Sequence, residues 1–261
     1  MPDRTGFLVT EPVRVLILGG TTEATQLCDA LEADQAVAPI LSLAGRTERP
    51  VVPNIPFRVG GFGAVPGLSD YLRRERIGAV VDATHPFAAQ IKRNAAAACA
   101  ATDVPLLAYS RAAWVSSPGD RWTLVDTILG AISALGDRPR RVFLTTGRID
   151  IAQFRTAPQH FYLVRTIDLP APELLPPHCR SIQARGPFSA ETEEALMRAE
   201  RIEVLVTKNS GGAATAGKLT AARNLGLPVI MVERPATPQR LETHDLARVL
   251  AWIADQRPPA P

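Results

Sequence analysis

"VRVLILGGTTEA", residues 13–24, predicts a strand, a glycine turn and a helix in direct succession. Residues 13–18 form an almost continuous apolar run of strand length, and Gly19 permits a tight turn out of the strand. The next apolar residues recur at the i, i+3, i+4, i+7 spacing of one helical face, and they are Ala24, Leu27, Cys28 and Leu31. Because a dinucleotide-binding turn needs this strand–turn–helix context, the stretch is a candidate nucleotide site.

The glycine fingerprint of dinucleotide-binding proteins is altered in this turn. Counted from Gly19, the middle glycine is Thr21 and the last is Ala24, which still allows close packing of helix and strand. Amide groups at a helix start and threonine hydroxyls are suitable partners for a phosphate. Glu23 favours the helix dipole but would repel a phosphate if it pointed inward. The expected pyrophosphate-binding residues are Gly19, Gly20, Thr21, Thr22 and Glu23. An ordinary βα turn that binds nothing is the alternative.

Short apolar runs rich in β-branched residues recur along the chain, as expected for parallel strands that are covered on both faces. The predicted strands lie within residues 14–20, 38–46, 57–63, 78–86, 104–111, 140–148, 160–168, 180–187, 202–212 and 227–235. The pattern pauses at residues 112–122 and then restarts. We therefore predict two Rossmann-like α/β domains with parallel sheets flanked by helices, residues 1–111 and 112–256, and a disordered proline-rich tail, residues 257–261. A single doubly wound sheet is the alternative.

The end of the second predicted strand bears on the choice of nucleotide. NAD-type sites place an acidic residue there to bind the ribose 2′-OH, whereas this chain has Arg46 and no acid. An arginine suits a 2′-phosphate and favours NADPH over NADH, unless Arg46 is a solvated surface residue. The GGFG segment supplies Gly60, Gly61 and Phe62 as a further glycine turn where the backbone can approach a ligand.

The run DATHPFAAQIKRNA, which begins at Asp82, follows the fourth predicted strand. Its first residues are expected at the carboxyl edge of the sheet, where ligands bind in open α/β folds. Thr84, His85, Pro86 and Phe87 are therefore candidate cofactor-binding residues, with Pro86 in the first turn of a helix. His85 is a candidate proton donor or hydrogen-bond partner, and a structural histidine bonded to the backbone is the alternative.

Basic residues recur at the ends of the predicted strands and suit an anionic small molecule. They are Arg111, Arg148, Arg165, Arg185 and Lys208. Two loops offer consecutive N–H groups as anion nests, and their candidate residues are Thr146, Gly147, Ser210, Gly211 and Gly212. Each basic residue taken alone is as consistent with an exposed surface position.

Composition limits the class of function. The 261 residues carry a formal net charge of +3, which is too small to indicate a nucleic-acid partner. Cys28, Cys99 and Cys179 are too far apart in sequence for a disulfide framework or a zinc knuckle, and no metal site is predicted. The sequence contains no signal-peptide-like apolar segment and no apolar run of about 18 residues. A cytoplasmic protein without membrane contact is expected.

Two further motifs do not support other enzyme classes. The segment GAATAGKL, residues 212–219, nearly matches the phosphate loop of NTPases, but Leu219 stands where a Mg²⁺-binding hydroxyl residue is needed. A kinase or NTPase is therefore disfavoured. Glu191, Glu193 and Glu194 fall within a predicted helix, residues 189–200, and are interpreted as part of its exposed face.

Seven motifs in this order resemble the precorrin-6A reductase family of cobalamin biosynthesis. They are LILGGTTEA, SLAGRT, GGFG, DATHPFAAQIKRNA, YSR, LTTGR and TKNSGG, and they span nearly the whole chain. The resemblance implies a two-domain α/β enzyme with its active site in the cleft between the domains. It implies that NADPH reduces one double bond of the precorrin-6A macrocycle to give precorrin-6B.

The resemblance also suggests roles for the candidate residues. Arg46 would bind the 2′-phosphate, the basic strand ends would bind the carboxylates of the tetrapyrrole, and His85 or Lys208 would donate a proton. Neighbouring enzymes of the cobalamin pathway are candidate protein partners. Two alternatives stay open, a cobalt-precorrin-6A reductase of the anaerobic pathway and a non-catalytic NADP-binding regulatory module.

Overall fold

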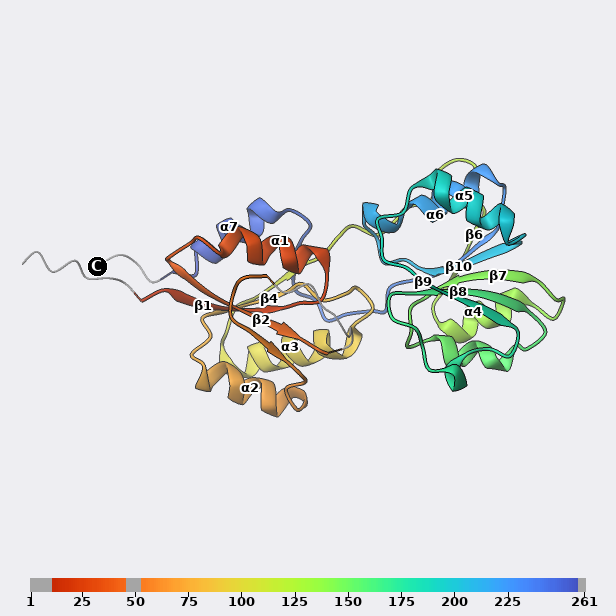
Figure 1. The fold of residues 1–261 in the computed structure, drawn as a ribbon. Coiled ribbons are helices and arrows are strands. Elements are labelled where there is room, and N and C mark those ends of the chain that lie inside the picture. Colours follow the sequence, from red (N-terminus) through yellow and green to blue (C-terminus); the bar gives the residue numbers. More distant parts are fainter. Residues whose placement is uncertain (1–10, 46–52, 258–261) are drawn as a thin grey trace, which may run out of the picture. The chain divides into compact units, whose positions relative to one another are not determined.

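The computed structural model describes residues 11–45 and 53–257, and it divides the chain into two compact units (Figure 1). The first unit combines residues 1–110 with residues 236–261, and the second comprises residues 111–235. Arg46 and the last four residues of the predicted tail lie outside the described residues. The prediction of two α/β domains with parallel sheets is confirmed.

The first unit is built on a six-stranded parallel sheet with the order β12-β5-β4-β1-β2-β3. The strands are β1 (Val13–Leu18), β2 (Val37–Leu43), β3 (Phe57–Val59), β4 (Ala79–Asp82), β5 (Leu106–Tyr109) and β12 (Leu241–Thr243). The order β3-β2-β1-β4-β5 is that of the dinucleotide-binding fold, in which the direction of chain progress reverses between β1 and β4. This switch point opens a crevice at the carboxyl ends of the strands.

Helices cover both faces of the first sheet (Figure 1). On one face lie α1 (Thr22–Leu31) and α7 (Leu246–Ala254), and on the other lie α2 (Ala64–Arg74) and α3 (Ala89–Thr102). The predicted inner face of α1 is confirmed, because Ala24, Leu27, Cys28 and Leu31 are all buried. Two apolar layers thus enclose a sheet whose strands are themselves apolar on both sides.

The second unit contains another six-stranded parallel sheet, with the order β6-β11-β10-β7-β8-β9. Its strands are β6 (Trp122–Val125), β7 (Arg141–Thr145), β8 (Phe161–Thr166), β9 (Cys179–Gln183), β10 (Val204–Lys208) and β11 (Val229–Val232). Its α-helices are α4 (Ile128–Leu135), α5 (Ala190–Ala199) and α6 (Gly217–Asn224), with short 3₁₀ turns at η1 (Ile151–Thr156), η2 (Pro172–Leu174) and η3 (Ala213–Thr215). The order β9-β8-β7-β10-β11 repeats that of the first unit, so its switch point lies between β7 and β10.

The last segment of the chain corrects the predicted domain boundary. Residues 236–256 were expected in the second domain, but β12 pairs with β5 of the first sheet and α7 packs on its core through Val249 and Ile253. The apolar face of α7 drives this return, since it is buried among the residues of the first core. Arg257, expected in the disordered tail, forms an ion pair with Asp34 at 2.6 Å.

Candidate functional site

A pocket of about 640 Å³ lies at the carboxyl ends of β1, β2, β3 and β4, which is the switch point of the first sheet. It brings together seven of the predicted cofactor-binding residues, namely Gly19, Gly20, Gly60, Gly61, Phe62, Thr84 and His85. Ser42, Gly45, Gly63, Gln90 and Asn94 also line it and were not predicted. Thr21, Thr22, Glu23, Pro86 and Phe87 are not among the lining residues.

The turn after β1 is shaped by two glycines with different tasks. Gly20 has a φ of 109°, a conformation that favours glycine, so it makes the turn that was expected of Gly19. A Cβ atom on Gly19 would lie 2.4 Å from the Cδ1 atom of Leu41, so Gly19 is needed for close packing against β2. Both roles bring backbone to the edge of the pocket.

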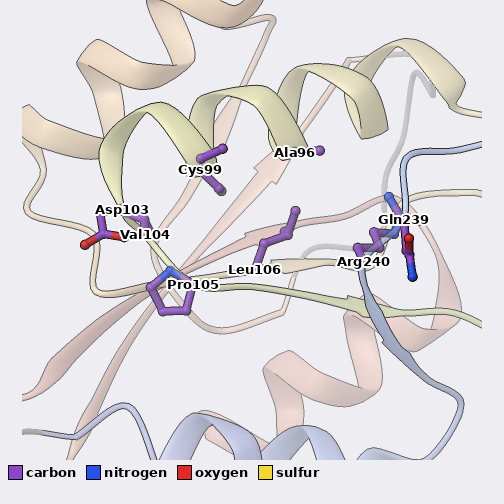
Figure 2. Close-up of a pocket in the computed structure, with 9 residues that line it drawn as sticks. Ala96, Cys99, Asp103, Val104, Pro105, Leu106, Gln239 and Arg240 are labelled. Carbon is purple, nitrogen blue, oxygen red and sulfur yellow. The ribbon is translucent and has the colours of Figure 1, made fainter.

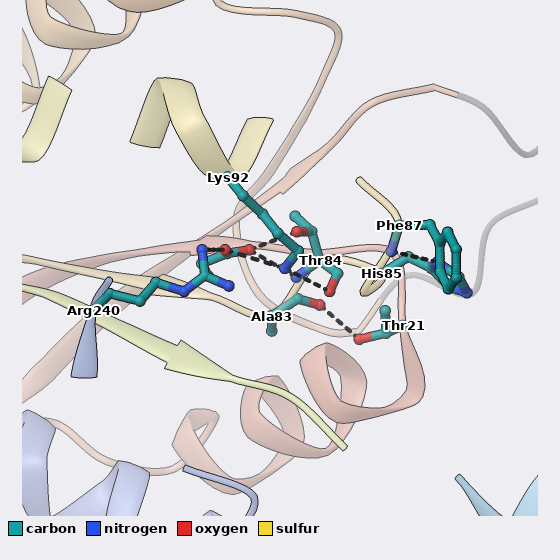
Figure 3. Close-up of polar contacts among 8 residues, drawn as sticks. Thr21, Ala83, Thr84, His85, Phe87, Lys92 and Arg240 are labelled. Atoms are coloured by element: carbon teal, nitrogen blue, oxygen red, sulfur yellow. Dashed lines mark hydrogen bonds and ion pairs between the residues drawn. The ribbon is translucent and has the colours of Figure 1, made fainter. Parts of the chain in front are cut away.

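Thr21 is the N-cap of α1 and ties the turn to the end of β4 (Figure 3). Its hydroxyl accepts a hydrogen bond from the Ala24 amide at 3.2 Å and donates one to the Ala83 carbonyl at 2.7 Å. The hydroxyl that was expected to contact phosphate therefore already holds two strand ends of the switch point in register.

Arg58, a residue that sequence reasoning missed, organises the GGFG loop. Its guanidinium donates to the Ser42 hydroxyl at 2.8 Å and to the carbonyls of Gly60 and Gly61 at 2.9 and 3.0 Å. It also lies 4.0 Å from the centre of the Phe62 ring, a cation–π distance. The sequence offered one hint of this role, because Arg58 stands two residues before the glycine pair. The hydrogen-bond partners of Arg58, however, depend on the pairing of β3 with β2.

The GGFG loop ends at Gly63 and leads directly into a helix whose amino end lines the pocket. Gly63 has a φ of 81° and is the N-cap of α2, with no side-chain cap. Ala88, the N-cap of α3, also lines the pocket and also lacks a side-chain cap. Helix starts without side-chain caps present amide donors that suit anionic groups.

A buried charge cluster holds the loop after β4 in place (Figure 3). Asp82 is fully buried and accepts hydrogen bonds from the Thr84 amide at 3.1 Å and the Thr84 hydroxyl at 2.6 Å. Its other oxygen lies 3.3 Å from the Lys92 ammonium and 2.9 Å from the Arg240 guanidinium. Burial lowers the pKa of Lys92 and Arg240 lowers it further, while Asp82 raises it. Lys92 and Arg240 were not predicted as part of the site.

His85 lines the pocket through a fixed ring. Its Nδ1 atom accepts a hydrogen bond from the Phe87 amide at 3.2 Å, so the neutral ring carries its proton on Nε2. This contact closes a turn, and α3 consequently begins at Ala89 rather than at Pro86 as predicted. The arrangement leaves His85 with a defined donor atom.

A second pocket, of about 360 Å³, lies between α3 and β5 and includes Cys99 and Arg240 (Figure 2). Burial raises the pKa of the Cys99 thiol to about 12, so this cysteine is not a nucleophile near neutral pH. The guanidinium of Arg240 is committed to Asp82. Neither the Cys99 thiol nor the Arg240 guanidinium therefore marks this pocket as a catalytic site.

Two predicted substrate residues of the second unit have acidic partners within the protein. Lys208 forms an ion pair with Asp150 at 2.5 Å. Arg165 donates to both carboxylate oxygens of Glu193, at 2.5 and 2.8 Å, and is buried beside it. Glu193 was interpreted as exposed, which is wrong, because only 2% of its surface is accessible.

The loop from Ser210 to Gly212 has a packing role that the sequence did not reveal. A Cβ atom on Gly211 would lie 2.1 Å from the Ala112 carbonyl oxygen, and one on Gly212 would lie 2.8 Å from the Cδ atom of Arg111. The glycines therefore allow the loop to contact the start of the second unit. Of the remaining predicted residues, Thr146 is buried, Arg148 is half-buried, Arg185 is exposed, and Gly147 has a φ of 87°.

No helix in the described ranges is long and apolar enough to cross a membrane. Among the same residues, no group of three or more histidine, cysteine, aspartate or glutamate side chains is placed to hold a metal ion.

The fold and the glycine-lined pocket define a class, the doubly wound α/β proteins with a nucleotide-type crevice at the switch point. The family model described as precorrin-6x reductase CbiJ/CobK matches residues 14–254. The chain belongs to this family.

Individual relatives agree with the family match. The chain is 50% identical over 242 residues to precorrin-6A reductase of Rhodobacter capsulatus, with 93% of this chain and 96% of the relative covered. A solved structure of CobK precorrin-6A reductase has 50% sequence identity and a TM-score of 0.87, covering 94% of this chain and 97% of that one. Cobalt-precorrin-6A reductase of Salmonella typhimurium is 30% identical over 240 residues, 85% of this chain and 87% of the relative.

Proposed function

We propose that the chain is an NADPH-dependent reductase that reduces one double bond of precorrin-6A, giving precorrin-6B, in cobalamin biosynthesis. The observation that carries this proposal is the 50% identity to precorrin-6A reductase of Rhodobacter capsulatus, which extends over 93% of this chain and 96% of that protein. The identity to the cobalt-precorrin-6A reductase of Salmonella typhimurium is lower, at 30%, which favours the metal-free ring as substrate.

The pocket of the first unit fits a dinucleotide. A Cβ atom built on Gly20, Gly60, Gly61 or Gly63 meets no atom within 4 Å, so the backbone at these positions is open to a ligand. The helix starts at Gly63 and Ala88 add amide donors for phosphate oxygens. NADPH, when bound, supplies the hydride.

In this proposal the chain binds and orients the cofactor through named segments. Residues 19–23 approach the pyrophosphate, and Arg46 binds the 2′-phosphate. Residues 60–62 and 84–87 contact the adenosine or nicotinamide side, with Asp82 fixing Thr84. The cluster around Asp82 thereby keeps the pocket wall rigid for the cofactor.

The substrate requires cations and one proton. We assign the ring carboxylates to Arg111, Thr146, Gly147, Arg148, Arg165, Arg185, Lys208, Ser210, Gly211 and Gly212, as expected from the sequence. Since Arg165 is already bound to Glu193 through both carboxylate oxygens, its part is to fix that wall of the site. His85 is the first candidate proton donor through its Nε2–H group, and Lys208 is the second. The location of the active site between the two units stays a prediction.

The first test is a calorimetric titration of the full chain with NADPH and then NADH. We expect tight binding of NADPH, and for Arg46→Ala a fall toward the affinity for NADH. Arg138→Ala, which removes an exposed arginine of the second unit, is the control and should bind NADPH as the unchanged chain does. Equal affinity of the unchanged chain for both nucleotides would contradict the NADPH assignment.

Turnover decides between the proposal and its alternatives. NADPH oxidation is followed with precorrin-6A and with cobalt-precorrin-6A as substrates. Faster turnover of the metal-free ring is expected. Preference for the cobalt-containing ring would support the anaerobic pathway, and tight NADPH binding with no turnover of either ring would support a regulatory module.

A further inference from the structure

Lys218 is a buried lysine of the second unit that has no carboxylate partner within residues 11–45 and 53–257. It is the second residue of α6 and only 4% of its surface is accessible. Its ammonium donates to the Thr215 carbonyl at 3.1 Å and lies 4.8 Å from the centre of a Trp114 ring. An ammonium has three N–H donors, so this carbonyl satisfies only one of them. Buried charges in proteins are normally paired, which makes Lys218 unusual.

The first unit shows what such a lysine needs. The shared strand order places β4 and α3 in one unit where β10 and α6 lie in the other. In each, a lysine follows the strand's last residue at the same spacing (82 to 92, and 208 to 218). Lys92 reaches Asp82, which ends β4, at 3.3 Å. In the second unit the corresponding strand ends in Lys208. Lys218 therefore matches Lys92 in position, but no carboxylate stands at the end of its strand.

Glu193, the acidic group whose charge raises the pKa of Lys218, does not replace that carboxylate. Glu193 is engaged by the Arg165 guanidinium through both of its oxygens, and Arg165 is also stacked 3.8 Å from the centre of the Phe188 ring. Burial is the largest cause that lowers the pKa of Lys218, Arg165 and Arg111 also lower it, Glu193 raises it, and together they place it at about 7. An anion that reaches this lysine would therefore meet a group that gains a proton as it binds.

We propose that the Lys218 ammonium binds a carboxylate of the anionic ring substrate. The inference rests on the proposed function, because a polycarboxylate tetrapyrrole is the source of that carboxylate. The proposal assigns a substrate-binding role to the segment GAATAGKL, which resembles a phosphate loop without its hydroxyl residue. Above neutral pH, substrate binding is accompanied by proton uptake on Lys218.

The test uses the full chain and three variants. Lys218→Met removes the charge, Lys218→Arg keeps a charge that does not titrate, and Arg138→Met removes an exposed charge from the same unit as a control. KM for precorrin-6A is measured at saturating NADPH between about pH 6.5 and 8.5, and the Kd for NADPH is measured by calorimetry. For Lys218→Met we expect a KM about 10- to 100-fold higher, the worth of a hydrogen bond to a charged group, and an unchanged Kd for NADPH. The KM of the unchanged chain rises above about pH 7, whereas that of Lys218→Arg does not.

Each other outcome has a definite meaning. A Lys218→Met variant with the KM and pH profile of the unchanged chain overturns the inference, while the proposed function survives through the turnover of the unchanged chain. Loss of NADPH affinity in that variant also overturns it, since the anion would then be a cofactor phosphate. If the unchanged chain neither binds nor reduces precorrin-6A, the proposed function fails and the inference fails with it.

A measurement on the unchanged chain covers the case in which Lys218→Met does not fold. Precorrin-6A is titrated without NADPH at about pH 8 in phosphate and in Tris, whose ionisation enthalpies differ. We expect the apparent binding enthalpies to differ by an amount that corresponds to uptake of close to one proton. Equal enthalpies in the two buffers would mean no proton uptake and would refute the inference.

Discussion

Replacing Lys218 by methionine should change how the stability of the second unit depends on pH. Burial lowers the pKa of Lys218 to about 7 in the folded chain, against 10.5 for an unperturbed lysine. The unfolded chain therefore binds more protons between these values, so this group makes the folded state more stable as pH rises above about 7. A shift of one pKa unit corresponds to about 1.4 kcal/mol.

The size of the effect follows from these two values. For a folded pKa of about 7, the contribution of Lys218 to the free energy of unfolding rises by about 2 kcal/mol between pH 7 and pH 9. Methionine has a similar length and no charge, so the variant lacks this rise. We expect Lys218→Met to be more stable than the unchanged chain at pH 7 and to lose about 2 kcal/mol of that advantage by pH 9.

The assay is urea unfolding at pH 6, 7, 8 and 9, followed by tryptophan fluorescence. A Trp252→Phe background removes the tryptophan of the first unit and leaves Trp114 and Trp122, both of which belong to the second. Other titrating groups are common to both chains and cancel in the difference. Parallel stability curves for Lys218→Met and its parent would refute the reasoning, because they would show that Lys218 stays charged in the folded state.

Three further changes test the first unit. Arg58→Ala removes three hydrogen bonds that shape the pocket wall, so the Kd for NADPH should rise about tenfold in calorimetry, and an unchanged Kd would contradict this role. Asp82→Asn leaves the Lys92 and Arg240 charges buried without a carboxylate, so the free energy of unfolding in urea should fall by about 3–5 kcal/mol. A fall below about 1 kcal/mol would contradict this stabilising role of Asp82. Gly19→Ala introduces a Cβ atom 2.4 Å from the Cδ1 atom of Leu41, and its melting temperature should fall in step with an overpacking cost of about 1–3 kcal/mol. An unchanged melting temperature would contradict the packing role of Gly19.

The strands that the sequence predicts and those that it misses differ in burial. Ten apolar runs each contain a strand, and the two strands without a predicted run are β6 and β12. Both are short and half-exposed, so they carry no continuous apolar signal. Each takes the outer place beyond the fifth strand of its sheet, β11 or β5. β6 belongs to the continuous segment that forms the second unit, whereas β12 follows the return of the chain to the first unit after residue 235. This long-range return is why the predicted end of the second domain was wrong.

The candidate site divides in the same way. The glycines at residues 19–20 and 60–61 were predicted, because a glycine's backbone freedom is a local property that sequence displays. Arg58 and Arg240 were missed, because what they contact depends on strand pairing and on the return of the chain after residue 235. The sequence names a charged residue, but only the fold decides which carboxylate or carbonyl it meets.

The difference between the two units comes from the residue at one strand end. Both sheets have the same order and both keep a buried lysine after the strand beyond the switch point. Where that strand ends in Asp82, the lysine is neutralised and the pocket beside it is lined by glycine backbone, which suits a ligand held by amide groups. Where it ends in Lys208, the buried lysine donates to a backbone carbonyl and has no carboxylate partner among the described residues, so a bound anion stabilises its charged form. A repeated fold can thus supply a nucleotide-type site in one unit and a carboxylate site in the other.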